Sequence, residues 1–386
     1  MTITPLDALP LETLRRRSST KWRTFPEDVL PLFVAETDFP LAEPIRAALS
    51  DAVEIGDTGY TPPDPGLRAA YVGFARRRFG WELEPKRVAW TGDVMMGVVE
   101  LLRATVAPGD RVVITPPVYP PFFFCIEEAG GVPQEVPLLA SDDGWVLDLD
   151  GIEAALAAGA RAVLLCNPHN PTGTAHAKES LAALAEIAAR HGAVVISDEI
   201  HAPLAQPGSG FTPFLAVSAT AAGVGYAVTS ASKAFNLAGL KCALILTGAD
   251  ATTAVVRSLP REVEWRTGLF GAIAAVAAFD EASDAWLDAL LARLDENRML
   301  LAELVAEHLP LARFAIPDAG FLAWIDLSAY GWGDDPARAV LAGARVALHH
   351  GPEFGTGGAG YARLNFGCSP DVLREAITRI GALTRA

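Results

Sequence analysis

The middle of the chain alternates short apolar runs with stretches of helical periodicity. Runs of four or five mostly apolar residues, typical of buried strands, occupy positions 88–91, 111–115, 162–166, 193–196, 226–229 and 243–247. Between them, Val98–Val106 and Glu179–His191 place apolar residues at a helical spacing, and each stretch is followed by a glycine or proline stop signal. This alternation predicts an α/β domain with a mostly parallel sheet. Because ligands of such sheets collect at the carboxyl ends of the strands, we expect a functional site in the loops that follow them.

Beyond about residue 282 the pattern changes. An amphipathic helix is predicted from Trp286 to His308, followed by strand-like runs at 321–327, 345–349 and 361–366 and by a final helix at 370–384. This order indicates a smaller α+β domain. We therefore expect a large domain over residues 50–282, and a small domain formed by residues 1–49 and 283–386.

Composition and charge narrow the possible partners. The 386 residues are 51% apolar and 20% charged, and the formal net charge is -15. This acidity disfavours nucleic acids and anionic membranes as partners, although a locally positive pocket for an anionic cofactor stays possible. The apolar run Gly268–Phe279 is too short for a membrane span and suggests a buried helix. Residues 1–22 lack the apolar core of a signal peptide, and four scattered cysteines suggest free thiols, so a cytoplasmic location is expected.

Two charged residues follow neighbouring apolar runs. Asp198 ends the run that begins at Ala193, and Lys233 follows the run 226–229. Pyridoxal 5'-phosphate (PLP) chemistry needs such a pair, because a lysine amine forms a Schiff base with the cofactor aldehyde and a carboxylate keeps the pyridine nitrogen protonated. Taken alone the pair is weak evidence, since a lysine at a strand end is usually a solvated surface residue.

Other loops after strands carry polar or aromatic residues. Asn170 lies in a stiff loop with two Asn-Pro dipeptides, and its amide can donate to a phenolate oxygen such as PLP O3′. Tyr119, held between prolines, suits stacking on a flat ring, although a buried turn aromatic is the alternative. Gly92, Asp93 and Val94 enter a helix and can form an anion site, or equally an ordinary turn with Asp93 as the N-cap.

Four further side chains need a functional or a structural explanation. Arg363, on an otherwise apolar strand, can grip a substrate carboxylate, or it can form a structural salt bridge. His201, three residues after Asp198, can face the same ring, although a lone histidine is more often structural. His349 and His350 lack a third metal ligand at suitable spacing, so no metal site is expected.

The set Asn170-Pro171-x-Gly173, Asp198, Ser230-x-x-Lys233 and Arg363 resembles the fold type I PLP-dependent enzymes, the aspartate aminotransferase superfamily. The resemblance covers nearly the whole chain in order. It implies PLP as the cofactor, and a PLP-dependent transferase-like α/β fold with a mostly parallel seven-stranded sheet in the large domain and a smaller α+β domain.

The resemblance also implies a role for each matching residue. Lys233 would carry the Schiff base and move the Cα proton, and Tyr60 would reach the phosphate in a neighbouring subunit, which implies a homodimer. The remaining implied contacts are Asp198 with the pyridine nitrogen, Asn170 with O3′, Tyr119 with the ring face, Arg363 with the substrate α-carboxylate, and Gly92, Asp93, Val94, Ser230 and Lys241 with the phosphate. Lys241 stands where the family often has an arginine.

Within the superfamily, Ser197–His201 and Ser232–Leu240 are similar to the MalY/PatB branch of cystathionine β-lyases, or cysteine-S-conjugate β-lyases. That likeness implies an L-amino acid substrate with a β-sulfur substituent, and pyruvate, ammonia and a thiol as products. Thr37 and Phe321 depart from the expected methionine and tyrosine, which leaves the β-substituent undetermined.

Two alternatives stay open from the sequence. A class I/II aminotransferase acting on an L-amino acid and a 2-keto acid would use the same residues. A binding or regulatory protein that keeps the fold is disfavoured by Lys233 and by the absence of a recognisable DNA-binding module.

Overall fold

A computed structural model describes residues 3–141 and 144–385. The strands are β1 Leu30–Pro31, β2 Val88–Thr91, β3 Arg111–Ile114, β4 Val132–Glu135, β5 Leu139–Ser141, β6 Gly144–Val146, β7 Ala162–Cys166, β8 Val194–Asp198, β9 Gly225–Thr229, β10 Ala243–Thr247, β11 Leu322–Asp326, β12 Val346–Ala347, β13 His349–His350 and β14 Tyr361–Asn365. The helices are α1 Leu11–Leu14, α2 Thr20–Arg23, α3 Glu43–Glu54, α4 Leu67–Phe79, α5 Val94–Thr105, α6 Pro121–Glu128, α7 Leu149–Ala157, α8 Lys178–Arg190, α9 Ala219–Val224, α10 Asp250–Arg257, α11 Glu262–Trp265, α12 Leu269–Phe279, α13 Asp284–His308, α14 Pro336–Ala344 and α15 Pro370–Ala382.

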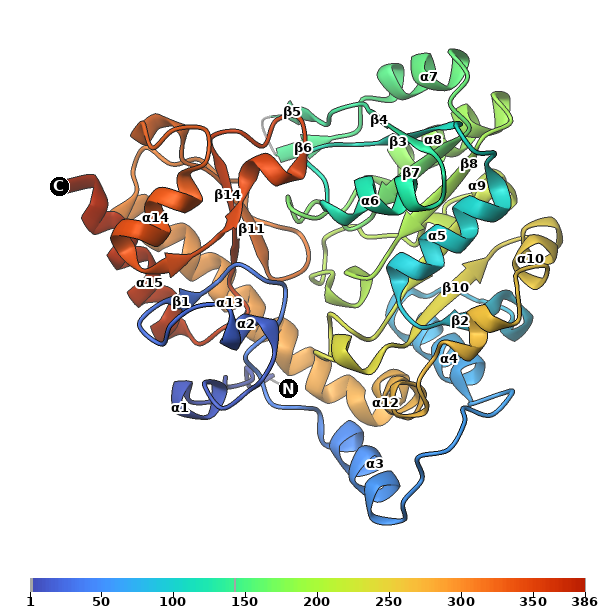
Figure 1. The fold of residues 1–386 in the computed structure, drawn as a ribbon, viewed down its shortest axis with the longest axis horizontal. Helices are drawn as coiled ribbons and strands as arrows, with labels where there is room; N and C mark the ends of the chain where they lie inside the picture. Colours follow the sequence, from blue (N-terminus) through green and yellow to red (C-terminus); the bar gives the residue numbers. More distant parts are fainter. Residues whose placement is uncertain (1–2, 142–143, 386) are drawn as a thin grey trace.

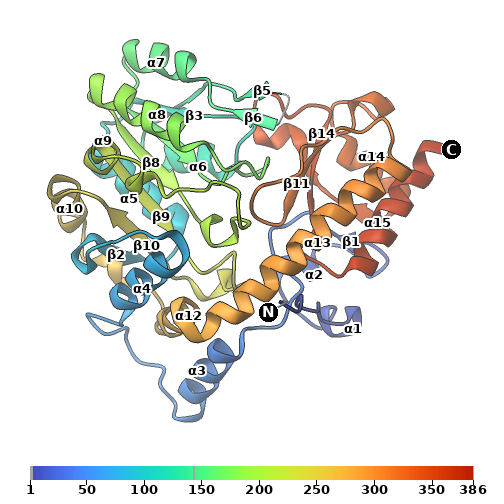
Figure 2. The same cartoon turned by 180° about the vertical axis from the view of Figure 1, so that it is seen from behind.

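A seven-stranded sheet in the order β2-β10-β9-β8-β7-β3-β4 forms the centre of the larger part of the molecule. Strands β9, β8, β7, β3 and β4 pair in parallel, and only β10 runs antiparallel to its neighbours β9 and β2. Helices cover both faces, with α5 and α6 on one side and α8 and α9 on the other (Figures 1 and 2). The predicted α/β class and the mostly parallel seven-stranded sheet are confirmed.

The direction of β10 has a consequence for the site. Because β2 and β9 are both antiparallel to β10, they run in the same direction as β8, β7 and β3. The carboxyl ends of these five strands therefore share one edge of the sheet. The loops that begin at Gly92, Asn167 and Ser230 all leave from that edge.

The C-terminal part contains the small sheet β11-β14-β13, packed with α14 and α15. The N-terminal segment joins this part, because Leu30 and Pro31 of β1 pair with Val346 and Ala347 of β12. Helix α13 runs from the larger part into the C-terminal part (Figure 2). Its leucine stripe is buried, as the helical spacing predicts.

Helix α12 explains the longest apolar run. Its glycine and alanine residues pack closely, and a Cβ at Gly271 would meet the carbonyl of Leu240. It contacts α3 and α4 inside the fold, as expected for a buried helix of small residues. No helix in the described parts of the chain combines the length and apolarity needed to cross a lipid bilayer.

Candidate active site

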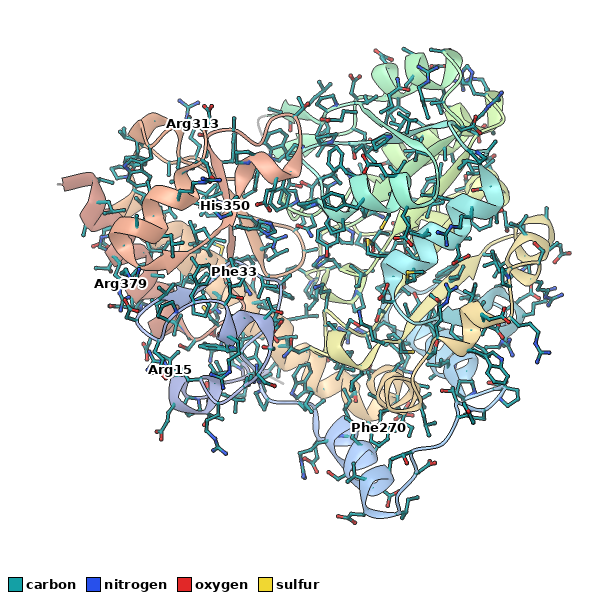
Figure 3. All side chains as sticks on the ribbon, in the orientation of Figure 1. Arg15, Phe33, Phe270, Arg313, His350 and Arg379 are labelled. Atoms are coloured by element: carbon teal, nitrogen blue, oxygen red, sulfur yellow. The ribbon has the colours of Figure 1, made fainter. Side chains whose placement is uncertain are left out.

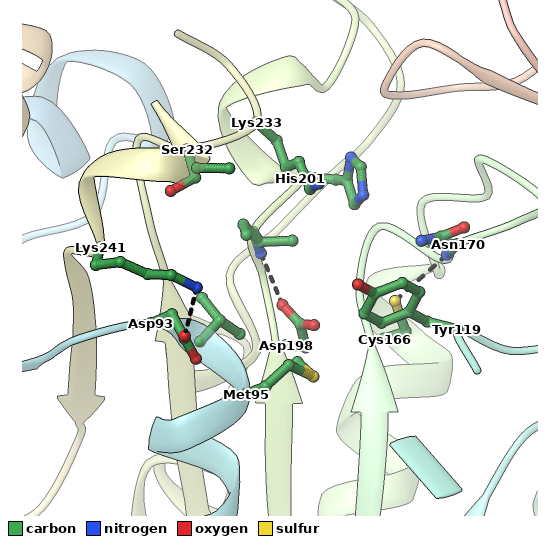
Figure 4. Close-up of a pocket in the computed structure, with 13 residues that line it drawn as sticks. Asp93, Met95, Tyr119, Cys166, Asn170, Asp198, His201, Ser232, Lys233 and Lys241 are labelled. Atoms are coloured by element: carbon green, nitrogen blue, oxygen red, sulfur yellow. Dashed lines mark hydrogen bonds and ion pairs between the residues drawn. The ribbon is translucent and has the colours of Figure 1, made fainter. Parts of the chain in front are cut away.

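A cavity of about 190 Å³ lies at the carboxyl edge of the large sheet. Its volume exceeds several-fold the roughly 30 Å³ share of a liquid water molecule, so it can hold a ring-sized ligand. Residues from five of the predicted loops line it (Figure 4): Asp93, Val94, Met95, Tyr119, Cys166, Asn170, Asp198, Ile200, His201, Ser232, Lys233, Ala238 and Lys241. The structure therefore brings together Asp93, Val94, Tyr119, Asn170, Asp198, His201, Lys233 and Lys241 from the residues that the sequence singled out.

Lys233 reaches into this cavity from the loop after β9. Its Nζ donates a hydrogen bond to the carbonyl of Ala35 at 3.1 Å. Burial and, to a lesser extent, the positive charge of Arg363 lower the Lys233 pKa from 10.5 to about 8. About a tenth of the amine is therefore unprotonated at pH 7, far more than for an ordinary lysine, and this is the form that a nucleophilic or proton-accepting amine requires.

Asp198 forms the floor of the cavity as the last residue of β8. It is 2% exposed, and burial raises the pKa of its carboxyl group from 3.8 to about 7. Its Oδ1 accepts the N–H of Ile200 at 3.0 Å (Figure 4). A carboxyl group this deeply buried is stabilised in its ionised form by a cationic ligand, such as a protonated ring nitrogen.

Asn170 and Arg363 are bonded to each other at one side of the cavity. The Arg363 guanidinium is 2% exposed and donates from Nη1 to Asn170 Oδ1 at 3.0 Å. Because arginine can only donate, this contact identifies the oxygen of the Asn170 amide and leaves its Nδ2 as the donor for another group. Arg363 forms no salt bridge with the described residues, so the structural salt bridge that the sequence left open is not found.

The opposite end of the cavity is formed by the start of α5 and by Lys241 (Figure 4). Asp93 caps the helix, since its Oδ1 accepts the N–H of Met96 at 2.9 Å. Its Oδ2 pairs with Lys241 Nζ at 3.0 Å, and the Lys241 side chain is 60% exposed. Of the two alternatives for Asp93, the structure shows the N-cap. The Asp93 carboxylate also pairs with Lys241, whose ammonium group can bind an anion next to the helix N-terminus.

Gly92 and Ser230 shape the cavity without lining it. A Cβ at Gly92 would lie 3.1 Å from the carbonyl oxygen of Arg266, so a side chain there would press on the residue that follows α11. The Ser230 hydroxyl donates to the Cys242 carbonyl at 2.6 Å and accepts the N–H of Ser232 at 3.0 Å. Ser232, which the sequence did not single out, is the serine of this loop that faces the cavity.

Tyr119 and His201 complete the walls. Burial raises the pKa of the Tyr119 phenol, so its ring is neutral over the ordinary pH range. Burial, with Lys233 and Arg363 as further causes, lowers the pKa of His201 to about 3, which makes its imidazole neutral. The His201 ring packs edge-on against Phe321, one of the two positions that depart from the MalY/PatB pattern.

Tyr60 does not reach the cavity of its own chain. Its side chain is 90% exposed and lies 6.3 Å, centroid to centroid, from the ring of Trp265. It belongs to the long loop after α3, which projects from one end of the molecule in both views (Figures 1 and 2).

A segment that the sequence analysis did not anticipate closes over Lys233. Residues 33–37 cross between the two parts of the molecule, and the backbone of Thr37 exchanges hydrogen bonds of 3.3 Å with the Asn236 side chain. Asn365 Nδ2 donates to the carbonyls of Val34 and Glu36, both at 2.7 Å. These contacts join residues about 200 and 330 positions apart, so no local pattern could reveal them.

The groups around the cavity together match one kind of ligand. One end offers a helix N-terminus and an ammonium group to an anion, the floor offers a buried carboxyl group, and the far side offers an amide donor beside a guanidinium. A titratable lysine amine lies above them. This arrangement fits a flat ligand that carries an anionic group at one end and a basic ring nitrogen over Asp198.

Comparisons with known proteins agree with this geometry. The family model "Aminotransferase class I and II" matches residues 27–380. A Mycobacterium leprae protein, provisionally named cystathionine beta-lyase, is 44% identical over 99% of this chain and 98% of its own length. Cystathionine beta-lyase PatB of Bacillus subtilis is 34% identical, covering 94% of this chain and 96% of its own. The PLP-bound C-S lyase of Staphylococcus hominis superposes with a TM-score of 0.87 at 25% identity over 96% of each chain.

Proposed function

Because the chain belongs to the aminotransferase class I and II family, we propose that it is a PLP-dependent carbon-sulfur β-lyase. It would act on cystathionine or a related cysteine S-conjugate and release pyruvate, ammonia and a thiol. Relatives along the whole chain that are named cystathionine beta-lyase support the reaction class. The observation that carries the proposal is the meeting of Lys233, Asp198 and Asn170 around one cavity, with Arg363 bonded to Asn170 behind the lining.

The residues present fit PLP. When bound, PLP supplies an aldehyde that captures amines and a ring that accepts electrons from the substrate Cα. The α5 N-terminus, Ser232 and Lys241 would hold the phosphate, and the Asp198 carboxylate would hold the protonated ring nitrogen. Asn170 Nδ2 would donate to O3′, because its oxygen already accepts from Arg363. Tyr119 would stack on the ring.

The remaining steps use groups of this chain. Arg363 would bind the α-carboxylate of the amino acid and orient its Cα–H bond toward Lys233. Lys233 Nζ, with its pKa lowered to about 8, would take the Cα proton and then protonate the departing thiolate. After elimination of the sulfur group, water hydrolyses the remaining three-carbon fragment to pyruvate and ammonia, so the lyase reaction needs water alone as a second reactant, whereas transamination needs a keto acid to complete its cycle.

We propose further that the active enzyme is a homodimer in which Tyr60 reaches the neighbouring site. The side chains of Val53, Ile55, Tyr60 and Trp265 are 64%, 72%, 90% and 67% exposed. Exposed large apolar side chains at the C-terminal end of α3 and on the loop after it, with Trp265 beside Tyr60, are typical of a surface that associates. The boundaries 50–282 and 1–49 with 283–386 remain our proposed domains, and a cytoplasmic location remains proposed, supported by four buried free cysteines.

The test is a product assay on PLP-loaded protein with L-cystathionine, with and without a 2-keto acid. We expect pyruvate and free thiol in equal amounts without the keto acid. Lys233→Ala should abolish both products and shift the visible absorbance of the bound cofactor. Turnover that begins only when the keto acid is added would favour the aminotransferase instead.

A further inference from the structure

Arg363 has an unusual neighbour on the adjacent strand. His349 of β13 and Arg363 of β14 are direct partners in an antiparallel pair, so their side chains share one face of the small sheet. The two side chains are hydrogen-bonded, with 2.8 Å between Arg363 Nη2 and His349 Nδ1. On the other side of the ring, His349 Nε2 lies 3.0 Å from Glu353 Oε2.

These two contacts determine the tautomer of His349. Arginine has donors only, so Nδ1 must be the unprotonated acceptor, and the proton of the neutral ring is then on Nε2. There it donates to the Glu353 carboxylate. Burial, followed by the charge of Arg363, lowers the His349 pKa to about 3, which agrees with a neutral ring. The carboxylate thus orients the ring that orients the guanidinium.

The guanidinium is held from several sides. Nη1 donates to Asn170 Oδ1 at 3.0 Å, Nη2 donates to the Phe33 carbonyl at 2.9 Å and to His349, and the ring of Phe354 lies 5.1 Å from Cζ. Three of the five N–H donors are therefore used. Of the two that remain, Nε is buried and has no partner among the described residues. A fixed guanidinium with free donors is prepared for a carboxylate.

We propose that His349 is a positioning residue for substrate binding, which holds the Arg363 guanidinium through its Nδ1 while Glu353 holds the ring through Nε2. The proposal rests on the proposed function, because it assigns Arg363 to the substrate α-carboxylate. The proposal predicts an effect on substrate binding and not on the chemical step. Loss of the acceptor should weaken the binding of molecules that carry this carboxylate and should leave chemistry at Cα largely unchanged.

A purely structural account also exists, in which the His349 ring fills space beside Phe354, 4.8 Å away between centroids. Two variants separate the accounts. His349→Asn keeps an acceptor oxygen near the position of Nδ1 and removes the ring, whereas His349→Phe keeps a ring and removes the acceptor. His350→Phe is the matched control, because His350 is the next residue of β13 and pairs with Asp335 at 3.0 Å instead (Figure 3 labels His350).

The experiment measures binding as well as turnover. PLP-loaded variants are titrated with L-alanine, which lacks a leaving group, and with ethylamine, which is the same molecule without the carboxylate, and the cofactor absorbance is followed. For His349→Phe we expect Kd for L-alanine and KM for L-cystathionine to rise about tenfold, as loss of a hydrogen bond to a charged group predicts. Its kcat and its Kd for ethylamine should stay within about twofold.

His349→Asn and His350→Phe should bind L-alanine within about threefold of the unmodified protein. The proposal is overturned if His349→Phe binds L-alanine normally, if its ethylamine affinity falls equally, or if His349→Asn is as impaired as His349→Phe. If the unmodified protein binds L-alanine but releases no pyruvate from L-cystathionine, the proposed lyase function is contradicted. The proposed role of His349 is still tested in that case, because the affinities for L-alanine do not depend on turnover.

Discussion

At the level of single residues, the site depends on charged groups kept away from water. Asp198 and Lys233 are both buried or partly buried, and burial shifts each pKa toward the neutral form, up for the acid and down for the amine. These shifts prepare the amine to react, and they also cost stability while no ligand compensates the charges. Functional sites commonly carry such costs.

The first prediction concerns the stability that the cofactor-free protein loses by burying the Asp198 carboxylate. The Asp198 pKa is raised to about 7 from 3.8, so the folded state binds more protons than the unfolded state between these values. Stability from this group is therefore lost as pH rises from about 4 to 7. Asp198→Asn removes the effect and should raise the free energy of unfolding at pH 8 by roughly 1–3 kcal/mol, and by less than half as much at pH 5.

Urea denaturation of both cofactor-free proteins at pH 5 and pH 8 measures the difference. An equal effect of the substitution at both pH values would contradict a buried carboxyl group with a raised pKa. With PLP present the order should reverse, because Asn cannot neutralise a protonated ring nitrogen.

At the level of elements, the segment between β1 and α3 links both parts of the molecule across the cavity. Its carbonyl groups at Phe33 and Ala35 accept hydrogen bonds from Arg363 and Lys233. One end of it is held by an ion pair of 2.7 Å between Lys21 of α2 and Asp38, whose side chains are 0% and 2% exposed. A charge buried this completely depends on its partner.

The second prediction is that Lys21→Met lowers the free energy of unfolding by about 2–4 kcal/mol, because Asp38 loses its buried partner. The double variant Lys21→Met/Asp38→Asn should recover part of this loss, since it removes the unpaired carboxylate. Arg46→Ala is the matched control, because it breaks an exposed ion pair with Glu43 and should cost less than about 0.5 kcal/mol.

Chemical denaturation at pH 7 measures all three variants. If Lys21→Met lowered the free energy of unfolding no more than Arg46→Ala does, the N-terminal segment would not depend on the buried ion pair. A lower affinity of Lys21→Met for L-alanine would connect this segment to the site.

At the level of the whole molecule, Tyr60 is the residue whose proposed role one chain cannot supply. Its exposed side chain and the neighbouring Trp265 lie outside the cavity that contains Lys233. A dimer with twofold symmetry would give each site one Tyr60 from the partner.

The third prediction uses mixed dimers. Lys233→Ala subunits are inactive by themselves, and Tyr60→Ala subunits should bind PLP weakly. In a mixed dimer one site keeps both residues, so random mixing should restore roughly a quarter of the unmodified rate. Activity no higher than that of the Tyr60→Ala protein after subunit exchange, verified by sedimentation, would exclude Tyr60 from the neighbouring site.

Local pattern predicts six of the seven strands of the large sheet, the helices α5, α8, α12, α13 and α15, and the loops that carry Asn170, Asp198 and Lys233, but it does not predict the edge strand β4. This succeeded because hydrophobic periodicity reports which face of an element is buried, and the carboxyl ends of parallel strands share an edge. Helices α5 and α8 end at Thr105 and Arg190, shortly before the predicted stop signals Pro108 and Gly192. Proline lacks the N–H that a helix needs, and Gly192 adopts the left-handed conformation that commonly follows a helix.

Only the tertiary structure decided which of these groups meet. Lys241 pairs with Asp93 across 148 positions, Lys233 bonds the Ala35 carbonyl across 198, and Arg363 reaches Asn170 across 193. His349 is a neighbour of Arg363 through strand register, and Ser232 lines the cavity whereas the Ser230 hydroxyl donates to the Cys242 carbonyl. Such contacts depend on how distant segments pack, and a local sequence pattern contains no information about the distance between them.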